Sequence, residues 1–194
     1  MTHQEWNDAA LLLLRVVVGG TMVAHGYNHA FGAGGLSGTA GWFASMGLRP
    51  PMVHATLSAA GEIGAGLLLI LGLMTPLGCA FVVGSMAVAW WVAHRRNGYF
   101  IFRDGYEYVL ALSATALGVS ALGAGRFSVD AAAGWGDDLR GGAGVLIAAG
   151  LGLGGALLLV VTCWRTRTGS YVEQPLSTTP PSDGLRDQHI KESS

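Results

Sequence analysis

The sequence predicts an all-α integral membrane protein in which a bundle of four helices is followed by a fifth transmembrane helix. The chain has 194 residues, of which 51% are hydrophobic and only 12% are charged, about half the charged share of an average soluble domain. Its apolar residues fall in long blocks. Segments such as 10–18 and 67–73 lack the polar stripe, with a period of about 3.6 residues, that a soluble helix shows. The lipid bilayer is therefore the better solvent for these segments.

Five segments are apolar over a length close to the roughly 20 residues that a membrane span requires. We expect these spans at about 9–30, 55–74, 77–93, 107–122 and 143–163. In the Gly-rich connection after the first span, residues 38–48 favour a short interfacial helix, which the following Arg49-Pro50-Pro51 ends. Residues 1–130 then form one transmembrane domain, residues 131–164 hold a loop and the additional helix, and residues 165–194 form a disordered polar tail.

The distribution of cationic side chains predicts how the chain is oriented. The net charge of −1 provides no basic field that would attract nucleic acid, so membrane lipid is the expected surrounding. Cytoplasmic loops of membrane proteins carry an excess of Lys and Arg. With five spans, one side receives Arg49, Arg95, Arg96, Arg103, Arg165 and Arg167, and the other receives Arg126 and Arg140. We predict a multi-pass protein of the cell membrane with its N-terminus outside and its C-terminus in the cytoplasm.

Ionisable residues inside the predicted spans are the candidate functional residues. A charged side chain at the centre of a span costs about 2.5–3.5 kcal/mol on insertion scales, and Arg15 and Glu62 both lie inside spans. His25 lies one helical turn before His29, so both side chains share one face of the first helix. His94 ends the third span and Glu107 begins the fourth. We predict a polar cleft lined by Arg15, His25, Glu62, His94 and Glu107.

Each of these residues also has a purely structural explanation. Arg15 either pairs with Glu62 inside the bundle or extends to the membrane surface, and Glu62 is then a protonated or hydrogen-bonded structural acid. The two histidines would cap the first helix at the interface, and His94 would belong to a solvated positive loop. A His-x-x-x-His pair can bind a transition metal, but no third ligand is assigned, so no metal site is expected.

The residue types of the predicted cleft suit a ligand with a polar head and an apolar tail. A quinone fits, because its carbonyl oxygens need donors such as His or Arg, and its reduction needs a proton donor such as Glu or His. The polar head group of a lipid fits the same set of side chains. No catalytic residue is assigned.

Several short motifs occur in a recognisable order along residues 9–130. They are Leu14-Arg15 with Gly19-Gly20 and His25-Gly26, Glu62 with Gly64 and Gly66, His94 with Asn97-Gly98-Tyr99-Phe100, Gly105-Tyr106-Glu107-Tyr108, and the stretch Gly125-Arg126-Phe127-Ser128-Val129-Asp130. Together they resemble the DoxX-like family of small integral membrane proteins. The resemblance implies a four-helix membrane domain related to quinone-linked redox subunits, such as those of thiosulfate:quinone oxidoreductase. Family members often carry Lys a few residues after the His-Gly pair, where this chain has His29.

The leading functional hypothesis is an accessory subunit of a membrane redox system that contacts quinone or lipid. An oxidoreductase subunit with its own activity is a rival, although the sequence has no dinucleotide-binding glycine fingerprint and no set of iron–sulfur cysteines. A small transporter and an assembly scaffold are further alternatives. The expected partner is a protein of a membrane complex or a second copy of the chain, and Gly150 with Gly154 forms a G-x-x-x-G motif that suits either a packing face or an oligomer face.

Overall fold

The computed structural model describes residues 2–136 and 138–165, and the regular structure in these residues is helical. In chain order the elements are α1 (His3–Phe31), α2 (Gly35–Ser45), α3 (Pro51–Leu71), α4 (Thr75–Ala89), the π-helical turn η1 (Trp90–His94), the 3₁₀ turn η2 (Ile101–Arg103), α5 (Glu107–Leu122), α6 (Val129–Ala132) and α7 (Gly141–Cys163). The predicted all-α membrane fold is confirmed. The tail predicted at 165–194 lies outside the described residues except for Arg165.

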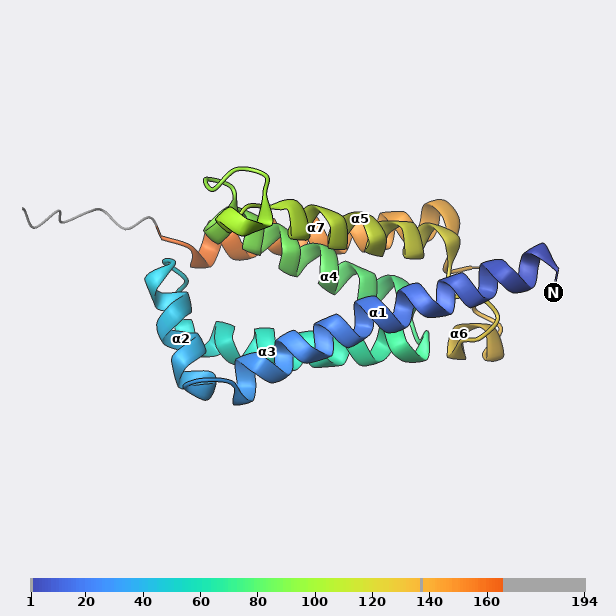
Figure 1. Ribbon diagram of the computed structural model, residues 1–194, viewed down its shortest axis with the longest axis horizontal. Helices are drawn as coiled ribbons and strands as arrows, with labels where there is room; N and C mark the ends of the chain where they lie inside the picture. Colours follow the sequence, from blue (N-terminus) through green and yellow to red (C-terminus); the bar gives the residue numbers. More distant parts are fainter. Residues whose placement is uncertain (1, 137, 166–194) are drawn as a thin grey trace, which may run out of the picture.

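Four segments of the described residues are long and apolar enough to cross a membrane, namely His3–Phe31, Pro51–Leu71, Thr75–His94 and Gly141–Cys163. Helix α5 is also apolar but has only 16 residues. Its length of about 24 Å falls short of the roughly 30 Å hydrocarbon core. It nevertheless packs against α4 and α7 and runs along the long axis of the bundle with them (Figure 1). The chain thus makes five passes along the bundle.

The chain begins at one end of the bundle, and α7 finishes at the other (Figure 1). The connections that carry Arg49, Arg95 and Arg103 lie at the end where α7 finishes (Figure 1). The α3–α4 turn, the loop after α5 and helix α6 lie at the end where the chain begins (Figure 1). Helix α1 starts at His3, before the predicted span, because Thr2 and Glu5 form a capping box at its first turn.

Glycines allow two pairs of helices to approach closely. A Cβ atom on Gly19 of α1 would lie 2.5 Å from the carbonyl oxygen of Gly66 on α3. A Cβ atom on Gly152 of α7 would lie 2.6 Å from the carbonyl oxygen of Ala80 on α4. Neither site has room for a larger residue, as is common where helices associate in lipid. The packing face of α7 therefore includes Gly152, whereas a Cβ atom on either glycine of the predicted motif, Gly150 or Gly154, would meet no atom within 4 Å.

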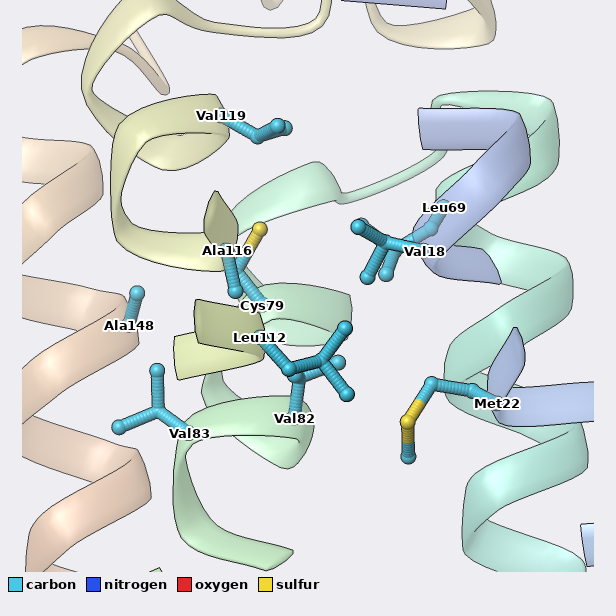
Figure 2. Close-up of a cluster of buried hydrophobic side chains, with 10 residues drawn as sticks. All are labelled: Val18, Met22, Leu69, Cys79, Val82, Val83, Leu112, Ala116, Val119 and Ala148. Atoms are coloured by element: carbon cyan, nitrogen blue, oxygen red, sulfur yellow. The ribbon is translucent and has the colours of Figure 1, made fainter. Parts of the chain in front are cut away.

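The main hydrophobic core lies between these two helix pairs. Figure 2 shows that α1 and α3 supply one side of the core, and α4, α5 and α7 supply the other. The core residues are Val18, Met22, Leu69, Cys79, Val82, Val83, Leu112, Ala116, Val119 and Ala148. Helix α2 belongs to a second apolar cluster, which closes the bundle at the end where α7 finishes (Figure 1).

Candidate functional site

Arg15 is fully buried (0% exposed), and its hydrogen bonds go to backbone carbonyls. Its Nη1 donates to the carbonyl oxygen of Leu69 at 3.4 Å, and its Nη2 donates to that of Phe127 at 2.5 Å. It lies roughly four turns, or about 21 Å along α1, before His29. Both structural explanations of Arg15 drawn from the sequence are therefore wrong, since it neither pairs with Glu62 nor extends to the membrane surface.

Asp130 is a second buried polar residue at the same end, and its carboxylate is well supplied with donors. Its Oδ1 accepts from the backbone N of Met74 at 2.7 Å, and its Oδ2 accepts from the backbone N and Oγ1 of Thr75 at 3.0 and 2.8 Å. Arg15 lies within electrostatic range of this carboxylate. Arg15 and Asp130 together join the segment after α5 to the end of α3 and the α3–α4 turn. Both residues therefore stabilise the fold.

Glu62 has a different environment, near the middle of α3 and roughly 16 Å along the helix from Pro51. The residue is 5% exposed. Its Oε1 accepts a hydrogen bond from Ser58 Oγ at 2.7 Å and lies 3.6 Å from His29 Nε2. Its Oε2 is buried and has no hydrogen-bond partner among the described residues. A buried carboxyl oxygen without a partner is costly, and it is available to a ligand.

Aromatic rings and a second histidine surround this carboxyl group. The His29 ring lies 6.1 Å from the Trp42 ring and 5.8 Å from the Phe43 ring, measured between centroids. Tyr108 of α5 lies within electrostatic range of Glu62, and its hydroxyl is 3.4 Å from His25 Nε2. The His25 and Tyr108 rings also stack, with centroids 6.0 Å apart. Imidazole, hydroxyl and carboxyl groups from α1, α3 and α5 thus converge within the bundle.

The remaining two predicted site residues hold the connection between η1 and α5. His94 Nδ1 lies 2.6 Å from the carbonyl oxygen of Asp104, so this nitrogen carries the proton. Glu107 Oε2 accepts from the backbone N of Ile101 at 3.1 Å. Both side chains therefore have partners within their own loop.

The structure brings together two of the five predicted site residues, Glu62 and His25, and separates Arg15 from them. The group that it assembles is named here the Glu62 cluster: His25, His29, Ser58, Glu62 and Tyr108. The predicted set omitted His29, Ser58 and Tyr108. His29 could have been predicted as a site residue, since it shares a helix face with His25. The sequence did not mark Tyr108 as a site residue, because a tyrosine at the start of a span is also typical of the aromatic belt at a membrane interface.

Comparison with known proteins bears on the first part of the chain. The DoxX family model matches residues 10–95. This segment is therefore similar to the DoxX family. It contains α2, α3, α4 and most of α1, and hence every member of the Glu62 cluster except Tyr108. The extension of the domain to residue 130 stays a prediction. No curated protein and no solved structure matches the chain.

The Glu62 cluster can bind a polar group and exchange protons with it. Ser58 and Tyr108 offer hydroxyl groups, and each histidine offers one donor and one acceptor when neutral. Within residues 2–136 and 138–165, no three His, Cys, Asp or Glu side chains lie close enough to hold a metal ion. The hydroxyl and imidazole groups of the cluster suit an organic ligand that has carbonyl or hydroxyl oxygens.

Proposed function

We propose that the Glu62 cluster of this DoxX-domain membrane protein binds the polar head of a quinone or quinol, and that the protein is an accessory subunit of a membrane redox system. The single observation that supports this most strongly is Glu62 Oε2, a buried carboxyl oxygen without a partner among the described residues. A membrane protein retains such a group at a cost of a few kcal/mol, so a use for it is expected.

A quinone needs hydrogen-bond donors for its carbonyl oxygens and proton donors for its reduction, and the cluster offers both. A quinone carbonyl accepts hydrogen bonds, which a protonated Glu62, His29 or Tyr108 can donate. Conversion of quinone to quinol takes up two protons along with two electrons, and Glu62 and His29 are groups that can deliver protons. The apolar walls of the bundle would hold the isoprenoid tail.

We propose an accessory role because the sequence lacks the common motifs that bind a redox cofactor. The chain has no dinucleotide-binding glycine fingerprint and only two cysteines, fewer than the four thiolates that typically hold an iron–sulfur cluster. Electrons would therefore come from a partner protein.

The proposed orientation puts the C-terminal end of the bundle in the cytoplasm, because Arg49, Arg95 and Arg103 lie in connections at that end. Arg96→Cys, in an exposed part of the connection, should react with a membrane-impermeant maleimide in inverted vesicles. Reaction in right-side-out vesicles instead would reverse the orientation.

The binding test uses Trp42, whose ring lies next to that of His29. Purified protein in lipid nanodiscs is titrated with a short-tailed benzoquinone, and quenching of tryptophan fluorescence is recorded. Trp42→Phe should remove most of the quenching at saturation. Glu62→Leu should weaken binding by about tenfold or more, since a hydrogen bond to an ionisable group contributes about 1.5–3 kcal/mol.

Two outcomes would count against the proposal. Quenching that is equal in wild type and Glu62→Leu would mean that the quinone partitions into lipid near other tryptophans. Competition by a phospholipid head group but not by other quinones would indicate that the cluster binds a lipid instead. Glu5→Gln, at a partly exposed acid in the first turn of α1, is the matched control and should bind as wild type does.

A further inference from the structure

Helix α2 lies against the His29 end of the Glu62 cluster. Thr39 Oγ1 of α2 donates to the backbone carbonyl of His29 at 2.9 Å. The Trp42 and Phe43 rings of the same helix face the His29 ring. Helix α2 itself lies at the end of the bundle where α7 finishes (Figure 1).

The last residues of α7 are fastened to the segment that follows α2. The backbone N of Arg49 donates to the carbonyl oxygen of Cys163, and the backbone N of Arg165 donates to that of Gly47, both at 2.9 Å. Leu48 and Trp164 form an antiparallel β-bridge. The indole Nε1 of Trp164 donates to the carbonyl oxygen of Met46 at 2.9 Å. These bonds join two segments that are far apart in the sequence.

Apolar packing reinforces this connection. Phe43 and Leu48 are buried in one cluster with Ala40 of α2 and Ala55 of α3, and Trp164 packs against it. The Trp91 ring of η1 meets the Trp164 ring edge to face, with centroids 6.1 Å apart. Trp164 thus contacts the α2 segment on one side and the continuation of α4 on the other.

The side of the cluster toward α5 is closed differently. Between α1 and α5, His25 is exposed and Tyr108 is half-buried, and the contact between them is a single long hydrogen bond with a ring stack. His25 lies in α1, which is long and apolar enough to cross a membrane, and the neighbouring Tyr27 is exposed as well.

We infer that Trp164 holds α2 as a cover over the Glu62 cluster, so that the cluster receives its ligand from the bilayer and not from the aqueous phase. The ligand enters through the seam between α1 and α5, at His25 and Tyr108. The ligand class is therefore a membrane-dissolved amphiphile, and Trp164 is a specificity-determining residue that lies outside the matched DoxX segment. The inference rests on the proposed function, since it concerns the access route to the same site.

The test measures access to Glu62 directly and needs no quinone. Carbodiimides add to carboxyl groups, and dicyclohexylcarbodiimide reaches them from the lipid, whereas its water-soluble ethyl-dimethylaminopropyl analogue reaches them from water. Protein in lipid nanodiscs is treated with each reagent, and the modified Glu62 peptide is quantified by mass spectrometry. In wild type the apolar reagent should label Glu62 and the water-soluble reagent should not.

Variants of Trp164 should open the covered side selectively. Trp164→Phe keeps a ring but loses the hydrogen bond to Met46, worth about 1 kcal/mol, so labelling by the water-soluble reagent should rise about fivefold. Trp164→Ala should raise it further, and labelling by the apolar reagent should stay unchanged in both. Trp6→Phe, at an exposed tryptophan near the other end of the bundle, is the matched control and should match wild type.

Several results would overturn the inference. Strong labelling by the water-soluble reagent in wild type, or no labelling by the apolar reagent, would mean that the ligand does not come from the bilayer. Unchanged labelling in Trp164→Phe, with unchanged amide hydrogen exchange across residues 46–50, would show that Trp164 does not hold the cover. Failure of quinone binding leaves these results intact, because they are measured without quinone.

Discussion

Replacing Glu62 with leucine is expected to stabilise the folded bundle. Glu62 is buried near the middle of α3, and one of its two carboxyl oxygens has no partner among the described residues. A site that evolved to bind a ligand often retains a group that destabilises the empty protein. Removing that group should therefore raise the free energy of unfolding while it removes ligand binding.

The size of the gain follows from the contacts of Glu62. An acidic side chain at the centre of a span costs about 2.5–3.5 kcal/mol on insertion scales, whereas leucine is favourable by about 0.3–0.6 kcal/mol. Against this stands the lost hydrogen bond with Ser58, which in a membrane is worth about 0.6 kcal/mol and at most about 1.7 kcal/mol. Ser58 can then bond to the backbone carbonyl one turn earlier. We expect a net gain of about 1–3.5 kcal/mol.

The assay is unfolding of the purified protein in mild detergent micelles by titration with sodium dodecyl sulfate, followed by helical circular dichroism. Glu62→Gln, which keeps a polar group, should change the free energy of unfolding by less than Glu62→Leu does. A double-mutant cycle with Ser58→Ala isolates the hydrogen bond between the two side chains. A loss of more than about 1 kcal/mol in Glu62→Leu would refute the reasoning, because Glu62 would then be a structural acid.

Three further predictions concern residues outside the cluster. Asp130→Asn should lower the free energy of unfolding by about 3–5 kcal/mol, because it removes a buried charge near Arg15, whereas exposed Asp138→Asn should have no effect in the same titration. Gly152→Val should destabilise the bundle by forcing α7 away from α4; equal thermal stability of Gly152→Val and Gly150→Val would contradict the packing. Cys79, which is fully buried, should resist alkylation in micelles until the protein unfolds.

Much of the helical architecture could be predicted from the sequence, because hydropathy reports directly on the bilayer. The apolar blocks located the four helices that are long enough to cross a membrane. The shorter helix α5 occupies residues 107–122, the fifth block. The predicted interfacial helix at 38–48 has its counterpart in α2 (Gly35–Ser45). Helix ends were less predictable, since α1 extends back to His3 through a polar first turn with its own cap.

The partners of the buried polar residues could not be predicted, because they depend on how distant segments meet. Arg15 bonds to Phe127, which lies far along the chain after four further helices. Burial of Glu62 was predictable from its place in a span, but its proximity to Tyr108 required the position of α5.

The packing face of α7 was ambiguous for a different reason. Glycine and alanine are so frequent in this helix that two stripes of small residues overlap along it. One contains Gly150 and Gly154, and the other contains Gly152 with Ala148 and Ala156. Spacing alone does not choose between them. The partner helix does, since Gly84 of α4 faces Gly152.

The most direct test of the central claim is native mass spectrometry of the protein released gently from its own membrane. Wild type should carry one bound quinone, together with any co-purifying oxidoreductase subunit, and Glu62→Leu prepared in the same way should carry none while remaining folded. Wild type that is bare or carries only phospholipid, or Glu62→Leu that retains the quinone, would contradict the assignment of the Glu62 cluster as the quinone site.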